Sequence, residues 1–299
     1  MTLKSVRWRR RAMLGACLVA ILAGCVAVNG GADAGKLREQ ADAALTRWAD
    51  AVAAAGGKPR VVVVGELTGQ IGDWEAKVGD NNKQALYAGL VSAIDLMPTA
   101  VPPDGDIEWP DGTTTAVPLL SAVEAVAAIR SNTTATCDEC TPLQITAAVL
   151  SSGPVETTLG PAVAPVWEFA LEGTAVKVTR VALANPVTVV PPPWNPNDPP
   201  GGLRIDSASA TVDGLELRVQ FVGAPLGGDQ PCGEDYTAEA VESDLAVAVI
   251  VTRHLNLGAG GCSAVGAMRT AVAMLAAPLG DRAVLEIQEG LPVPVQITR

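Results

Sequence analysis

Histidine, aromatic residues and basic residues are all scarce in this chain of 299 residues. It has one histidine (His254), two phenylalanines, two tyrosines, and 21 basic against 32 acidic residues. A single histidine without a Gly-x-Ser-x-Gly turn indicates no Ser-His-Asp triad. The glycine-rich residues 258–263 lack the Lys-Ser/Thr pair of a phosphate-binding loop. We therefore expect no catalytic residues and no cofactor, and the shortage of basic residues argues against a nucleic-acid partner.

The N-terminal residues have the pattern of an export signal. A basic cluster within residues 7–11 precedes an apolar run at residues 12–23, which is the arrangement of a secretory signal peptide. The run is too short to span a bilayer, which needs about 20 apolar residues. It ends in Leu22-Ala23-Gly24-Cys25, which resembles the lipobox of bacterial lipoproteins.

The lipobox resemblance implies how the protein is processed and held. In bacterial lipoproteins the chain is cleaved just before the cysteine, whose thiol carries a diacylglyceryl group and whose new amino end often carries a further fatty acid such as palmitate. We therefore expect a signal peptide at residues 1–24, favouring general secretory over twin-arginine export, lipidation at Cys25, and a short tether at residues 25–35. Two or more acyl chains hold a protein stably on a membrane, so we expect it on the extracytoplasmic side of the cell membrane.

Charge and composition describe the remainder of the chain. Five of the 21 basic residues and none of the 32 acidic residues lie in residues 1–24, so the rest has a formal net charge of −16. That sign argues against an electrostatic grip on anionic lipid. The abundance of Ala, Val, Gly and Pro, with arginine preferred over lysine, is typical of a GC-rich genome and indicates an actinobacterial source.

Four cysteines follow Cys25 and indicate disulfide bonds. An even number of cysteines outside the cytoplasm is first interpreted as disulfides, and of the three pairings we favour Cys137–Cys140 and Cys232–Cys262 because each is local. The C-x-x-C at Cys137 would supply half of a zinc site, but the second half is missing. The residues after Cys140 alternate as in a strand, whereas a thioredoxin-like redox pair needs a helix. We therefore expect no metal site.

The residue patterns predict an α+β fold in two parts. A mixed α/β part at residues 36–189 is followed by a proline-rich linker at 190–202, because such proline density does not enter a sheet interior. A mostly antiparallel β part then covers 203–299. Helices are predicted at residues 36–55, 82–96 and 119–129. Strands are predicted at residues 61–64, 107–109, 143–149, 166–171, 175–183, 204–212, 216–222, 245–253, 269–276 and 283–288, with a helix as the alternative at 264–276.

Several stretches resemble a group of uncharacterised lipoproteins of actinobacteria. These are residues 66–75, the Cys137/Cys140 pair, residues 160–169 and residues 278–282. The resemblance covers most of the chain after Cys25. It implies an envelope location and a β-rich fold, and it implies no activity.

The most suggestive polar residues lie between a predicted buried strand and a predicted helix, where α/β folds place ligand sites. We single out Glu66, Asp73, Trp74 and Glu75 as candidate binding residues. The favoured interpretation is a lipid-anchored envelope protein with a binding or structural role, whose partner is an envelope carbohydrate or protein. The alternative is a secreted hydrolase of envelope carbohydrate, which needs two carboxylates about 5–10 Å apart beside the sugar.

Three tryptophans and one polar segment give expectations about which residues are buried and which are exposed. The spacing of Trp48 and Trp167 predicts that both face a core, whereas Trp194 lies between prolines and is expected to be exposed. The segment Asn132-Thr133-Thr134 matches a glycosylation sequon and is interpreted as a polar loop.

Overall fold

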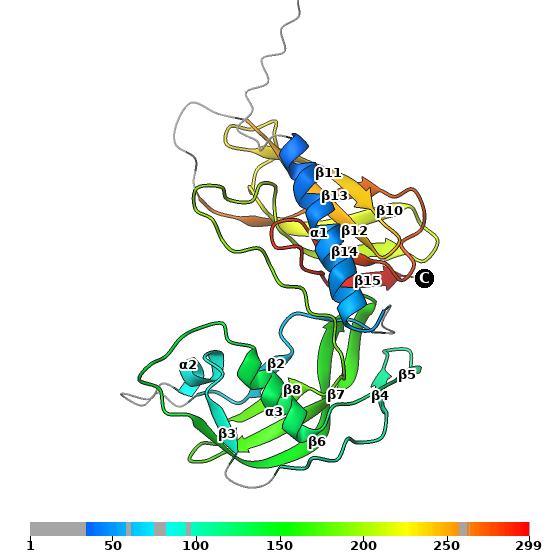
Figure 1. The fold of residues 1–299 in the computed structure, drawn as a ribbon. Helices are drawn as coiled ribbons and strands as arrows, with labels where there is room; N and C mark the ends of the chain where they lie inside the picture. The colour runs from blue at the N-terminus through cyan, green and yellow to red at the C-terminus, as the bar shows by residue number, and fades with distance from the viewer. Residues whose placement is uncertain are drawn as a thin grey trace, which may run out of the picture. The chain divides into compact units, whose positions relative to one another are not determined.

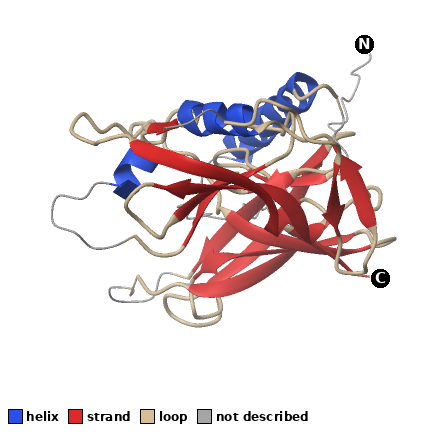
Figure 2. Ribbon diagram, turned by 90° about the horizontal axis from the view of Figure 1, so that it is seen from below, coloured by secondary structure: helices blue, strands red, loops and turns tan. Residues whose placement is uncertain are grey.

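The computed structural model describes residues 34–57, 61–74, 82–93, 97–256, 262 and 264–298. Strands, red in Figure 2, are the main regular structure in this part of the chain. The predicted signal peptide, Cys25 and Glu75 lie outside the described residues. Both predicted disulfides are present, Cys137–Cys140 and Cys232–Cys262.

The first helix, α1 (Ala34–Ala54), confirms the helix predicted at residues 36–55. Its apolar residues recur at helical spacing and form one buried stripe, listed as Leu37, Ala41, Ala44, Trp48 and Val52. The helix is followed by Gly56 and Gly57, whose φ angles of 94° and 105° suit glycine, and the Gly57 N–H donates to the carbonyl of Val52 at 3.0 Å. This is a glycine-terminated helix end.

The buried stripe of α1 packs on strands that come late in the chain. Its core includes Ala248 of β12 (Ala246–Leu255) and Leu285 of β14 (Ala283–Glu286), and Figure 1 shows α1 in blue lying along these strands. The helix that we grouped with the N-terminal α/β part therefore shares its core with the C-terminal strands. The division into two domains stays a prediction.

The residues that follow α1 in the sequence and precede the proline-rich segment form an eight-stranded sheet. Its strands are β1 (Val63–Val64), β2 (Thr68–Ile71), β3 (Val91–Ala93), β4 (Gly105–Glu108), β5 (Thr114–Val117), β6 (Leu143–Thr157), β7 (Gly160–Leu171) and β8 (Lys177–Val181). The central order is β1-β6-β7-β4-β5, while β8 joins β7 to β2 and β3 runs parallel to β6. The helix α3 (Ala122–Ser131) contributes Val126 and Ile129 to a core that includes Ile145 and Phe169 of this sheet.

The helix predicted at residues 82–96 is wrong in its second half. Helix α2 (Asn82–Tyr87) ends early, and the chain turns at Gly89, which has a φ of 67°. A Cβ atom at Gly89 would lie 2.6 Å from the carbonyl oxygen of Arg130, so only glycine fits there. The turn allows β3 to pair with β6, and this pairing outweighs the local helical pattern.

Ser121 starts α3 with a capping box. Its hydroxyl accepts a hydrogen bond from the Glu124 N–H at 3.3 Å, and the Glu124 carboxylate accepts one from the Ser121 N–H at 2.7 Å. These bonds satisfy N–H groups that a helix start leaves without partners. The backbone and side-chain hydrogen bonds from Ser121 lower the pKa of the Glu124 carboxyl.

Two further sheets form the C-terminal part. One has the order β13-β10-β9-β15, and the other has the order β11-β12-β14. Their remaining bounds are β9 (Ile205–Thr211), β10 (Glu216–Gly223), β11 (Glu234–Glu242), β13 (Ala267–Met274) and β15 (Val295–Thr298). Phe221 and Val249, one from each sheet, lie in a shared core. Most pairs are antiparallel, but β12–β14 and β15–β9 are parallel, and the alanine-rich segment forms strand β13 rather than a helix.

Residues 190–202 form neither helix nor strand and contact α1. Lys36 forms an ion pair with Asp198, and the Gly201 N–H donates to the Gln40 side-chain oxygen at 2.9 Å. Trp194 in this segment is 71% exposed, whereas Trp48 and Trp167 are buried, so all three tryptophan predictions are confirmed.

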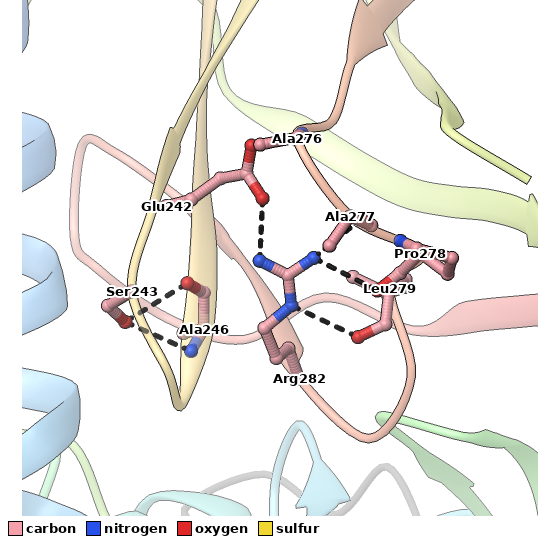
Figure 3. Close-up of polar contacts among 8 residues, drawn as sticks. All are labelled: Glu242, Ser243, Ala246, Ala276, Ala277, Pro278, Leu279 and Arg282. Carbon is pink, nitrogen blue, oxygen red and sulfur yellow. Dashed lines mark hydrogen bonds and ion pairs between the residues drawn. The ribbon is translucent and has the colours of Figure 1, made fainter.

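Two charged side chains of the C-terminal part, Arg282 and Glu286, each form several hydrogen bonds with their surroundings. The Arg282 guanidinium donates to the Glu242 carboxylate at 2.6 Å and to the carbonyls of Ala277, Pro278 and Leu279 at 2.9–3.1 Å, and Figure 3 shows it enclosed by these groups. Glu286, 1% exposed, accepts hydrogen bonds from three backbone N–H groups, those of Gln288, Glu289 and Leu291. Both residues hold turns in place.

Candidate functional site

A pocket of about 440 Å³ opens between the edge strand β2, helix α2 and the end of α3. Its wall combines hydroxyl, amide, carboxylate and ammonium groups with one tyrosine ring. The lining residues are Glu66, Thr68, Gly69, Gln70, Lys83, Leu86, Tyr87, Ile129, Asn132 and Thr134. A concave site with several polar groups around a small apolar floor suits a small polar ligand.

Backbone hydrogen bonds fix the two helices that shape the pocket. The N–H of Thr134 donates to the carbonyl of Tyr87 at 2.9 Å, so the chain leaving α3 closes the end of α2. The Arg130 side-chain Nε donates to the carbonyl of Val91 at 2.8 Å and ties α3 to β3. Asn132 is the C-cap of α3, and its N–H bonds the carbonyls of the last turn. The pocket wall is therefore part of the packed fold.

Two side chains of the wall are held by their neighbours. The Nζ atom of Lys83 lies 5.8 Å from the centre of the Tyr87 ring, one helical turn away, which is a cation–π distance. The Gln70 side chain accepts a hydrogen bond from the Trp74 indole N–H and donates to the carbonyl of Gly72 at 2.8 Å. These contacts orient an ammonium, a ring and an amide before any ligand binds.

Arg180 of β8 lies directly behind this wall. It is 7% exposed, and its Nη1 donates to the Thr68 hydroxyl at 3.1 Å. Its Nε is buried and has no hydrogen-bond partner. Burial lowers the pKa of the Arg180 guanidinium, and the nearby Glu66 carboxylate partly offsets that effect. Because arginine keeps its proton in proteins, a buried cation adjoins the pocket.

Three of the four residues that the sequence singled out are described by the structure, and they have different places. Glu66 lines the pocket, and Trp74 lies behind Gln70 and orients its amide. Asp73 is exposed and does not line the pocket, and Glu75 lies outside the described residues. Glu66 is the sole carboxylate among the described lining residues, and Asp73 does not join it there as the second carboxylate that a hydrolase needs.

Other residues at the pocket could not be recognised as site residues from the sequence. Asn132 and Thr134 belong to the segment interpreted as a polar loop, and they line the pocket because α3 ends beside α2. Arg180 stands in a predicted strand, and only the register that pairs it with Thr68 places it at the site. Within the described residues, no cluster of three or more His, Cys, Asp or Glu side chains is arranged to hold a metal ion.

Comparisons with known proteins leave the site to be interpreted from its geometry. No protein-family model, no curated protein and no solved structure matches this chain. Within the described part of the chain, no helix is both long and apolar enough to cross a membrane.

Proposed function

We propose that this chain is a lipid-anchored α+β protein of an actinobacterial cell envelope that binds a hydroxyl-rich small molecule, such as a saccharide, on the extracytoplasmic side. The observation that carries the binding role is the pocket beside β2. Amide and hydroxyl groups of Gln70, Asn132 and Thr134 offer both donors and acceptors, and the Tyr87 ring offers a face for stacking. Saccharides present the matching combination of hydroxyl groups and apolar ring faces.

The proposed anchor is the lipid on Cys25. The support is the order of a basic cluster, a short apolar run and Leu22-Ala23-Gly24-Cys25 at its end. The disulfides Cys137–Cys140 and Cys232–Cys262 are the kind of bond that persists outside the cytoplasm. The nine residues from Cys25 to the start of α1 at Ala34 reach at most about 30 Å. The start of α1 would then lie close to the membrane surface.

Saccharide binding is tested on the full chain, purified in detergent, against a panel of envelope glycans and simple sugars. Gln70→Ala and Tyr87→Ala each remove one wall group, and each should weaken binding by about tenfold, the loss expected when one direct contact to a ligand is removed. Gln220→Ala is the matched control, because Gln220 is exposed on β10 in another sheet. A glycan that binds equally well to all three variants would place binding elsewhere.

The anchor is tested in cells. Cys25→Ala should abolish incorporation of labelled fatty acid and release the protein from the membrane fraction. Cys17→Ala is the matched control, because Cys17 lies within the apolar run and is lost with the signal peptide. Labelling that persists in the Cys25→Ala protein would rule out this anchor.

A further inference from the structure

Among the described residues, the pocket has more positive than negative charge, whereas the protein as a whole is acidic. In that part of the chain Lys83 lines the pocket and Arg180 lies behind it, against a single lining carboxylate, that of Glu66. The chain beyond residue 24 has a formal net charge of −16. A local excess of cations in so acidic a protein is unusual, and it attracts anions to this position.

Arg180 has a hydrogen-bond donor, its Nε, that no group in the described part of the protein accepts from. A buried guanidinium is costly unless its donors are engaged, yet its Nε has no partner and Thr68 accepts one bond from Nη1. Thr68 pairs with Arg180 across β2 and β8 and lines the pocket, so the guanidinium lies against the pocket wall. An anion in the pocket would compensate this charge.

We propose that the ligand of the pocket carries an anionic group, a carboxylate or a phosphate, in addition to its hydroxyl groups. Lys83 contacts that group directly, and Arg180 attracts it from behind Thr68. Glu66 accepts hydrogen bonds from ligand hydroxyls, as acidic side chains do when ionised. This inference rests on the proposed function and names the chemical class of its ligand: acidic saccharides, either uronic acids or sugar phosphates.

The test compares acidic and neutral probes on the full-length protein by calorimetry. Glucuronic acid oligosaccharides and glucose 6-phosphate should bind at least about tenfold more tightly than the matching neutral glucose saccharides, because charged hydrogen bonds are stronger. The preference should shrink as salt rises from about 50 mM to about 500 mM, because salt screens partly exposed charges.

Three variants assign the preference to residues. Lys83→Met leaves an exposed helix position apolar, and Arg180→Met removes the buried cation. In each variant the affinity for the acidic probe, relative to the neutral probe measured on the same variant, should fall to about threefold or less, because one of the two cations that favour an anion is lost. Thr68→Val removes the hydroxyl that holds the guanidinium and serves if Arg180→Met fails to fold. Lys177→Met is the control, since Lys177 pairs with Glu168 and does not line the pocket.

Each outcome decides a different point. Equal binding of acidic and neutral probes overturns the anionic ligand and leaves the saccharide site intact. An acidic preference that survives both Lys83→Met and Arg180→Met also overturns it. Binding of none of the probes overturns the proposed function and this inference together.

Discussion

Buried charges behave differently in the two parts of this protein. In the C-terminal part, the Glu286 carboxylate accepts hydrogen bonds from three backbone N–H groups. Arg282 donates four hydrogen bonds, one to Glu242 and three to nearby carbonyls. In the eight-stranded sheet, Arg180 is 7% exposed and so more buried than Arg282, yet it has one hydrogen bond and an Nε without a partner. Glu286 and Arg282 therefore find their hydrogen-bond partners within the protein, whereas Arg180 adjoins a pocket.

This difference separates structural charges from candidate binding charges. A buried charge whose donors or acceptors are all used stabilises the turn around it and has nothing left for a ligand. A buried charge with an unused donor beside a cavity costs stability in the free protein. The cost is recovered when an anion binds, so the stability of variants can tell the two kinds apart.

Glu286→Ala should give the largest loss of stability. It removes the acceptor of the N–H groups of Gln288, Glu289 and Leu291, and we expect a loss of about 3 kcal/mol in the free energy of unfolding. Urea denaturation measures it. Glu289→Ala is the control, because its carboxylate is 43% exposed and pairs with Arg204, a contact worth about 0.5 kcal/mol. A Glu286 loss no larger than the control would contradict a structural role.

Arg282→Lys should cost about 2 kcal/mol, because an ammonium cannot reproduce the planar set of donors that reaches Glu242 and three carbonyls. The same urea titration applies. Arg218→Lys on the exposed face of β10 should change stability by less than about 0.5 kcal/mol. Equal effects of the two changes would mean that the network in Figure 3 contributes little.

Acid should weaken the Arg282 network. Burial tends to raise the pKa of the Glu242 carboxyl, but hydrogen bonds from Arg282 and the Ala276 N–H, with the charge of Arg282, lower it below its usual 4.5. A carboxyl with a lowered folded pKa stabilises the protein above pH 4.5, and this stability is lost as pH falls through the folded value.

Unfolding free energies measured from pH 6 down to pH 3 test this expectation. The wild type should lose more stability over that range than Glu242→Gln, which no longer titrates there. Parallel curves for the two proteins would show that Glu242 does not contribute to the acid dependence.

Arg180→Met should give the smallest change, within about 1 kcal/mol in either direction, because replacing a poorly engaged buried charge by an apolar side chain of similar length is often neutral or stabilising. Urea denaturation in the absence of ligand measures it. A loss as large as that of Arg282→Lys would place Arg180 among the structural charges and remove the contrast between the two parts.

Local patterns were sufficient where the structure is decided locally. The spacing of apolar residues predicted α1 and α3, and the nearness of the cysteines predicted both disulfides. Local patterns were insufficient where the pairing of strands determines the structure. Strand β2 contains glycine and glutamine and is stabilised by β8, and β11 carries four acidic residues on a strand that β12 holds in place.

The candidate site was predictable only in part for the same reason. Glu66 follows a buried segment, which is a local signal. Asn132, Thr134 and Arg180 reach the pocket through the packing of α3 beside α2 and the register of β2 on β8, contacts that join residues far apart in the chain. Sequence spacing does not contain that information.

The packing of α1 has a mechanical consequence. The helix lies lengthwise on β12 and β14, and residues 198–201 brace its first turns through Lys36 and Gln40. Tension applied to the chain ahead of Ala34 would therefore act first on α1, and it would have to break the packing of α1 on β12 and β14 before it reached the segment that contains Glu66.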